Sequence, residues 1–396
     1  MDIESRRSCT MCFQRASSFV TAFSLVEVLV TVAVIVALLI VVVSMTEQTG
    51  SVWRRTTGKI EEFRDARNAF ETLTTRLSQA TLNTYWDYDS STLPKAYVRK
   101  SELRFISGPA SSYLGDGPNG TRVTHCVFFH ALFGSIDETQ GVAAANSAYR
   151  GLEGLLNVWG YYVELNSDGP LRPSFLAGTP NSPPARYRFR LMEFRQSSDQ
   201  MVTYNRTSGM DPTVAYGRSA AIGYQGTDWF RPAANATNGP CRVVAENIVA
   251  LLIVPRLSKA DEQALPAGLR STNPDYSPLS PNYAYDSSLT MNPGQSGASP
   301  FTNPKCQLPP VLQVTLVAID EASATRLNLT ASSTDLFNVS NKFSDTARFT
   351  TDLAIASLNN STASLENSLV SKKVNYRVFT TSVSIRSAKW SRDETN

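Results

Sequence analysis

The feature that most constrains this chain of 396 residues is an apolar run near the N-terminus, from Phe23 to Met45. The run is rich in Val, Leu and Ile and contains one ionisable side chain, Glu27. A bilayer core about 30 Å thick requires roughly 20 apolar residues in helical form. Because lipid offers no partner to open backbone groups, it enforces a helix despite the β-branched side chains. The run therefore predicts a transmembrane helix over 23–45.

Glu27 is costly to place in lipid. A charged side chain within a membrane span costs several kcal/mol at the midplane and less near an end. Such a residue is a functional candidate that requires a counter-charge. The alternative is an ordinary signal anchor in which the Glu27 side chain extends toward the headgroups.

Residues 23–29 read FSLVEVL, and this segment resembles the processing site of type IV prepilins and pseudopilins. The resemblance implies a cytoplasmic leader over 1–22, cleavage by a prepilin peptidase between Ala22 and Phe23, and N-methylation of the new amine. It also implies that Glu27 is the assembly carboxylate, which faces the N-terminal amine of a neighbouring subunit. The family usually has Gly before the cleaved bond, where this chain has Ala22.

The segment 46–88 is predicted to be the amphipathic half of the same helix. Its apolar residues recur at separations of three, four or seven, while charged residues fall largely off that stripe. The stripe consists of Ile60, Phe63, Phe70, Leu73 and Leu77. A helix continuing from Phe23 to Thr84 would be about 93 Å long. Gly50 and Gly58 are places where it could bend.

Strand signals dominate 89–396, which is predicted to be a β-rich globular domain. Enrichment in branched and aromatic residues predicts strands over Val123 to Leu132, Leu156 to Leu165, Arg186 to Phe194, Val249 to Val254, Leu312 to Ile319 and Tyr376 to Ile385. In the third strand, strict alternation places Tyr187, Phe189 and Leu191 toward a core. The arginines 186, 188 and 190 are then expected on the solvent side.

The predicted fold class is α+β, with the long N-terminal helix packed on an antiparallel β-sheet domain. This arrangement resembles pilins. The last strand and the segment 245–254 resemble the larger minor pseudopilins, and the whole is similar to pilin-like proteins of Verrucomicrobia multi-gene cassettes.

Two later segments lack strand signals. Ser271 to Pro310, within a Pro/Ser/Tyr-rich stretch near 258–310, has no sustained period and is predicted to be an extended surface insertion. Ser344 to Val370 has weak helical spacing through Phe349, Leu353, Ile355 and Leu358, which predicts a short helix or two.

The sequence contains no H-E-x-x-H, G-x-S-x-G or P-loop pattern, and we assign no catalytic residue. Gly115 to Gly120 matches G-x-G-x-x-G, but it leads into a predicted strand, which favours a surface turn over a dinucleotide site. His125 and His130 lie five apart in a strand and are expected to point to opposite faces.

We assign no metal or cofactor from the sequence. Three loop carboxylates are candidate calcium ligands, but they lack EF-hand spacing, which favours solvated side chains. They are Asp116, Asp275 and Asp286. The cysteines of the predicted domain fit either one disulfide and one buried thiol or three buried thiols. They are Cys126, Cys241 and Cys306.

The leading expectation is a non-enzymatic, minor pilin- or pseudopilin-like subunit of a type IV pilus or type II secretion-like fibre. It would cross the bacterial inner membrane once, with its C-terminal domain outside the cytoplasm. Its partners would be other pilin or pseudopilin subunits and the prepilin peptidase. A net charge of +3 argues against nucleic acid. The alternative is an uncleaved, membrane-tethered envelope adhesin or binding protein that grips glycan or protein through the Tyr-rich insertion.

Overall fold

Two units make up the chain, Met1–Gly58 and Lys59–Asn396. The computed structural model describes residues 24–89, 93–118, 120–135, 155–173, 175, 184–198, 201, 203, 227–236, 239–355 and 364–391. The longest element, the helix α1 (Leu25–Leu77), begins in the first unit and ends in the second.

The C-terminal part of α1 packs into the second unit through one apolar face. Its buried residues are Ala66, Ala69, Phe70, Leu73 and Leu77. Phe63 is half-buried against the same core. The predicted stripe is therefore confirmed from Phe63 onward, while the side chain of Ile60 lies outside the described residues.

The helix ends at Leu77 and does not continue to residue 88 as the sequence pattern suggested. Past this point, the backbone N–H of Thr81 donates to the carbonyl of His130 at 2.8 Å. The segment Tyr85–Tyr88 is a strand, β1, paired antiparallel with β2 (Tyr97–Lys100). Hydrogen bonds to the rest of the domain thus replace the bonds that would extend the helix.

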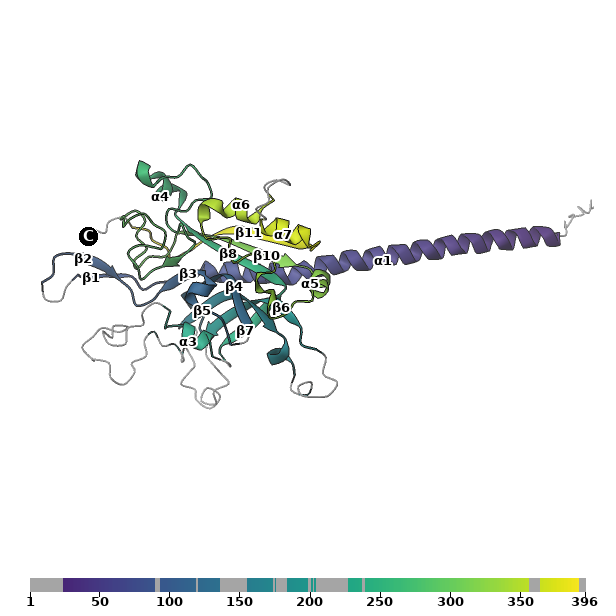
Figure 1. Cartoon of the computed structure of the whole chain (residues 1–396), viewed down its shortest axis with the longest axis horizontal. Coiled ribbons are helices and arrows are strands. Elements are labelled where there is room, and N and C mark those ends of the chain that lie inside the picture. Colours follow the sequence, from purple (N-terminus) through teal and green to yellow (C-terminus); the bar gives the residue numbers. More distant parts are fainter. Residues whose placement is uncertain are drawn as a thin grey trace, which may run out of the picture. The chain divides into compact units, whose positions relative to one another are not determined.

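The second unit contains two larger antiparallel sheets (Figure 1). One has the strand order β7-β6-β5-β4-β3-β9 and the other β11-β10-β8. Their bounds are β3 Phe105–Pro109, β4 Gly120–Leu132, β5 Leu156–Ser167, β6 Tyr187–Gln196, β7 Cys241–Glu246, β8 Ile248–Arg256, β9 Tyr285–Asp286, β10 Val311–Ile319 and β11 Tyr376–Ser384. All six predicted strands are confirmed, as is the α+β class.

Short helices connect the strands. They are α2 (Ala110–Tyr113), α3 (Arg231–Ala234), α4 (Lys259–Gln263), α5 (Glu321–Leu327), α6 (Phe349–Leu353) and α7 (Leu365–Ser371). The last two confirm the helices expected within 344–370, although Leu358 lies outside the described residues. The Ser364 hydroxyl caps α7 by accepting from the backbone N–H of Asn367.

Both faces of the six-stranded sheet are buried. Phe189 and Leu191 face the main core, which includes α1. On the opposite face, Phe128, Tyr162 and Phe230 belong to a second hydrophobic cluster. A sheet covered on both sides has no solvated face for polar residues.

Consequently, the expectation that three arginines of β6 point to solvent is wrong for two of them. Arg188 and Arg190 are buried, and Arg186, just before the strand, is exposed. Arg188 pairs with Glu321 at 2.7 Å, and Arg190 pairs with Glu246 at 2.9 Å. Carboxylates from α5 and β7 therefore allow the guanidinium groups to be buried.

The stretch 271–310 was expected to be a surface insertion, but much of it packs into the domain. Leu279, Tyr283 and Tyr285 are buried in the main core. Side-chain amides replace regular backbone pairing, as where Asn292 donates to the carbonyl of Leu279 at 2.8 Å. The missing periodicity thus indicates irregular backbone and not a lack of packing.

Close packing inside β5 gives a stability prediction. A Cβ at Gly160 would lie 2.3 Å from the ring of Phe128. We expect Gly160→Ala to lower the free energy of unfolding by about 1–3 kcal/mol, because overpacking forces the ring and backbone to shift. Denaturant unfolding of the full chain in detergent, followed by tryptophan fluorescence, measures the change. Gly268→Ala is the control, because nothing lies within 4 Å of its Cβ position. Equal stability of the two variants would contradict the packing argument.

Candidate functional site

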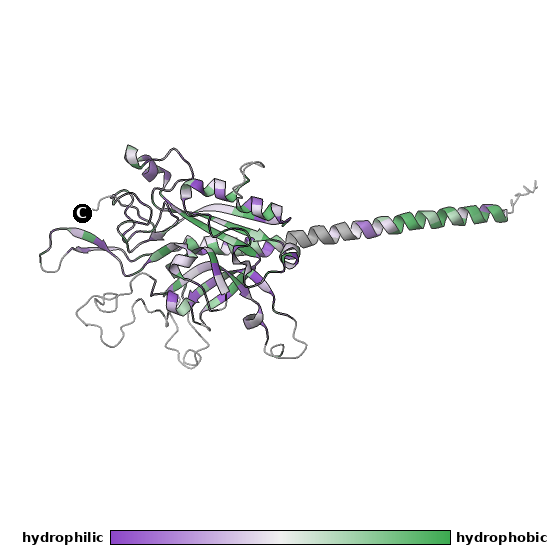
Figure 2. Cartoon of the chain, in the orientation of Figure 1, coloured by the Kyte–Doolittle hydropathy of each residue, from purple (hydrophilic) through white to green (hydrophobic). Residues whose placement is uncertain are grey.

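The first candidate site is the apolar section of α1, Leu25–Gly50. Its mean hydropathy is 3.2, and its large apolar side chains are exposed. Figure 2 shows this section as an apolar stretch of the helix. Among the residues that the structure describes, it is the one helix long and apolar enough to cross a membrane. The sequence-based prediction of such a helix is confirmed.

Hydroxyl groups in this section are satisfied within the helix. Each donates to a carbonyl three or four residues earlier. The pairs are Thr31 to Val28, Ser44 to Val41, Thr46 to Val42 and Thr49 to Met45, at 2.8 to 3.1 Å. An unpaired hydroxyl in hydrocarbon is costly, so this bonding makes the section compatible with lipid.

Glu27 differs from these residues. It lies in the first turn of α1, where its backbone N–H donates to the carbonyl of Ser24 at 2.9 Å. Its exposed carboxylate has no hydrogen-bonding or ion-pairing partner among the described residues. The positive end of the helix dipole favours a carboxylate here, but this effect is small compared with the cost of a charge in lipid. The predicted processing residues, Ala22 and Phe23, lie outside the described residues.

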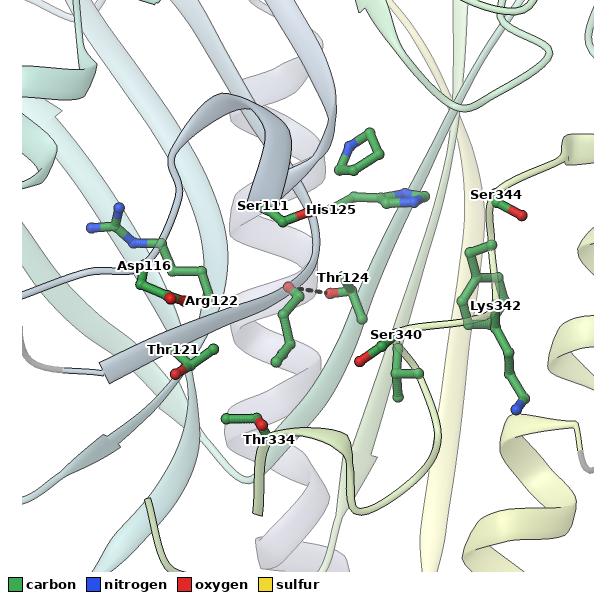
Figure 3. A pocket seen from close by; sticks show the side chains of 14 residues that line it. Ser111, Asp116, Thr121, Arg122, Thr124, His125, Thr334, Ser340, Lys342 and Ser344 are labelled. Atoms are coloured by element: carbon green, nitrogen blue, oxygen red, sulfur yellow. Dashed lines mark hydrogen bonds between the residues drawn. The ribbon is translucent and has the colours of Figure 1, made fainter. Parts of the chain in front are cut away.

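The second candidate site is a cavity of about 330 Å³ between β4 and the loop 334–344 (Figure 3). Hydroxyl groups dominate its lining. They belong to Ser111, Thr121, Thr124, Thr334, Ser340 and Ser344. The charged residues of the lining are Asp116, Arg122 and Lys342. This volume and polarity suit a small polar ligand.

A β-bulge forms one wall of this cavity. The register of β4 with β5 shifts after Val123, and Thr124 has a φ of 58°, which is unusual for a β-branched residue. The Thr124 hydroxyl accepts from the backbone N–H of Leu251 at 3.1 Å, and His125 Nδ1 accepts from that of Ile253 at 3.1 Å. These side chains bond the backbone of β8, the edge strand of the smaller sheet, and so join the two sheets.

Neither histidine is placed for acid-base chemistry. Burial lowers the pKa of His125 to about 4, and its Nδ1 accepts a hydrogen bond, so its proton lies on Nε2. Burial also lowers the pKa of His130 to about 4. His130 stacks on Trp229 in the second cluster, at 4.6 Å between ring centroids, whereas His125 faces β8. The prediction that they point to opposite faces is confirmed, and both rings are neutral at pH 7.

The structure does not bring the three candidate calcium ligands together. Asp275 accepts from the backbone N–H of Thr350 at 3.0 Å, while Asp286 accepts from that of Ser288 at 2.8 Å. Asp116 lies in the cavity described above. Within the described ranges, no three side chains from His, Cys, Asp and Glu are grouped so that they could hold a metal ion.

Cys126 and Cys241 belong to the second cluster and form no disulfide. Burial raises the pKa of both thiols, so both are protonated at pH 7 and unreactive. The sequence left the disulfide pair open among Cys126, Cys241 and Cys306, and the structure excludes the pairing of Cys126 with Cys241. They lie on β4 and β7, which are separated by β5 and β6 in the sheet.

A buried carboxylate, Glu193, fastens α1 to the six-stranded sheet. Trp159 Nε1 and Tyr161 Oη donate to it at 2.9 and 2.7 Å, and Arg76 and Arg242 form ion pairs with it. Burial alone would raise the pKa of this carboxyl. The hydrogen bond from Tyr161 and the charge of Arg76 outweigh burial, so the pKa of Glu193 lies below its ordinary value.

Sequence reasoning missed this centre, although a signal was available. Glu193 follows Phe189 and Leu191 in the alternation of β6, so it points to the same buried face. A carboxylate in that position requires partners. By contrast, nothing in the sequence pattern indicated the bulge at Thr124.

The low pKa of Glu193 gives a testable pH dependence. An ionised carboxylate with a lowered pKa stabilises the fold above the unfolded-state value of 4.5, and this contribution is lost as the pH falls through the folded-state pKa. We expect Glu193→Gln to lower the free energy of unfolding by about 2 kcal/mol at pH 7 and by much less at pH 3. Chemical denaturation at both pH values tests this. The exposed Glu262→Gln serves as control, and a pH-independent effect at position 193 would refute the assignment.

No protein-family model, curated protein or solved structure matches this chain. The resemblance of residues 23–29 to prepilins therefore remains a local likeness.

Proposed function

We propose that the chain is a minor pilin- or pseudopilin-like structural subunit of a type IV pilus or type II secretion-like fibre. In this proposal α1 anchors it in the bacterial inner membrane, the second unit lies outside the cytoplasm, and the protein is not an enzyme. The observation that carries the proposal is Glu27, an unpartnered carboxylate at the start of an apolar section of 26 residues. The hydroxyl groups of that section are bonded within the helix.

Cleavage before Phe23 would supply the missing counter-charge, because it creates a positively charged amine at the membrane end of each subunit. Opposite charges about 4 Å apart attract by roughly 4 kcal/mol at an effective dielectric constant of about 20, and more strongly in lipid. If the amine of one subunit pairs with Glu27 of the next, the contact is head-to-tail. Such a contact generates a helical fibre when the rotation between subunits does not close into a ring.

The continuity of α1 supports the same proposal. One helix carries both the apolar section and the face that packs into the main core. The apolar section and the helical face that packs into the main core therefore belong to one continuous helix. The second unit, Lys59–Asn396, is large for a subunit that repeats along a shaft, which favours a place at the tip or in priming of the fibre.

The rival is an uncleaved membrane-tethered binding protein. As expected from the sequence, its binding surface would be formed by tyrosines of the Tyr-rich insertion. Tyr283 and Tyr285 are buried in the core and cannot contact a large ligand. Tyr276, the third tyrosine of that stretch, is half-buried, so the rival would depend on this side chain or on a different binding surface.

Substitution of Glu27 tests the assembly role. We expect Glu27→Gln to leave membrane insertion intact and to reduce incorporation into fibres by about ten-fold or more, because the pairing charge is lost. Membrane fractionation and quantification of the protein in sheared fibres measure the two effects. Glu47→Gln, at the other end of the apolar section, is the matched control. Normal co-assembly of the Glu27 variant would refute the role.

Processing can be tested independently. We expect the mature protein to begin at N-methylated Phe23, as shown by intact-mass analysis of protein purified from membranes. Ala22→Gly should speed cleavage, because it restores the residue usual in the family. A chain that still begins at Met1 would instead favour the uncleaved binding protein.

A further inference from the structure

The hairpin of β1 and β2 exposes a row of aromatic side chains on one face. Trp86, Tyr88 and Tyr97 are 50%, 48% and 60% exposed. The register pairs Trp86 with Arg99 and Tyr88 with Tyr97, so all four side chains share a face. The rings of Tyr88 and Tyr97 are stacked, with centroids 5.1 Å apart. In Figure 1 the hairpin extends away from the larger sheets.

Polar contacts on the other face hold the hairpin in place. Lys100 forms an ion pair with Asp87, and Tyr85 Oη donates to Glu102 at 2.6 Å. An isolated two-stranded hairpin is marginally stable, and burying its aromatic residues would be the simplest way to stabilise it. Here the aromatic face is left open, which indicates a binding surface.

A cavity of about 520 Å³ adjoins this aromatic face and includes Trp86 and Arg99 in its wall. The Arg99 guanidinium lies 5.9 Å from the centre of the Trp86 ring and donates to the carbonyl of Ser391 at 3.1 Å. Lys389, also in the wall, is exposed, and no described carboxylate pairs with it. Arg99 is only 3% exposed, so Lys389 is the exposed cation of a lining that contains no carboxylate, and this lining favours an anionic ligand.

The hydroxyl groups of the cavity have defined roles. Thr84 Oγ1 donates to the carbonyl of Cys306 and Ser387 Oγ to that of Ala80, both at 2.8 Å. Their protons are thus committed to the protein, and their oxygen atoms can accept hydrogen bonds from a ligand. Acceptors beside a lysine suit a molecule that carries both hydroxyl groups and an acidic group.

We propose that this face binds an acidic polysaccharide. Sugar rings would stack through their C–H faces on Trp86, Tyr88 and Tyr97, while a carboxylate or sulfate group approaches Lys389. Trp86 and Tyr88 are about 6.8 Å apart along the strand, so neighbouring rings of an extended polymer can each meet one side chain. Single-stranded nucleic acid fits less well, because it carries a phosphate on every nucleotide whereas the described lining exposes one cation, Lys389. The inference does not depend on Glu27 or on cleavage.

An array of printed oligosaccharides tests this inference with the full-length protein in detergent. We expect binding to oligosaccharides that carry uronic acid or sulfate groups, weakened by salt. Trp86→Ala and Lys389→Ala should each reduce affinity by about ten-fold or more, because each removes a central contact. A fluorescent oligothymidylate of 15 nucleotides, titrated separately, serves as the nucleic-acid probe.

Two matched controls separate the site from general effects. Phe175→Ala removes an exposed ring outside the hairpin and the cavity, and Lys259→Ala removes an exposed charge from α4, which is not part of the cavity. Both should bind within about two-fold of the unmodified chain. Lack of binding to every acidic oligosaccharide, binding to neutral ones alone, undiminished binding by Trp86→Ala, or binding to the oligothymidylate alone would each overturn the proposal. Oligosaccharides with uronic acid and those with sulfate are printed at separate positions, so the array also identifies which acidic group the protein binds.

Discussion

A carboxylate surrounded by hydrocarbon requires a counter-charge, and this requirement shapes how the chain can be used. Glu193 finds its counter-charges within the domain, whereas Glu27 does not find one among the described residues. Glu193 is buried in the domain and receives two hydrogen bonds and two ion pairs from neighbouring side chains. Glu27 has no such partner in the described part of the chain. The first carboxylate stabilises its own fold, whereas the second receives no counter-charge from the described residues.

The domain satisfies its own polar groups through side chains as much as through regular pairing. Thr124 and His125 bond the edge of β8, and Asn292 fixes an irregular segment. Buried Arg188 and Arg190 are matched by carboxylates from neighbouring elements. These bonds allow two sheets and a long aperiodic stretch to share one core.

Periodicity predicted the regular elements well, because repeats of 2.0 and 3.6 residues follow from backbone geometry. It gave six strands and the buried face of α1. It failed where residues distant in the sequence determine the local structure. The chain after α1 bonds to another strand, as where the Thr81 N–H donates to the carbonyl of His130. The buried arginines of β6 depend on carboxylates from other elements. The aromatic hairpin was missed for the same reason, since residues 85–88 were assigned to the helix. The motif at residues 23–29 singled out Glu27, for which the described residues supply no partner.

The Glu193 centre also has a mechanical consequence. Arg76 lies in the last turn of α1 and reaches a carboxylate that β6 holds through its backbone. Tension applied along α1 would therefore pass to β6, the strand beside the edge strand β7, through the partly buried Arg76–Glu193 ion pair, as well as through the covalent chain that follows. A pull along this helix would be resisted at this junction before the loops of the domain began to unravel.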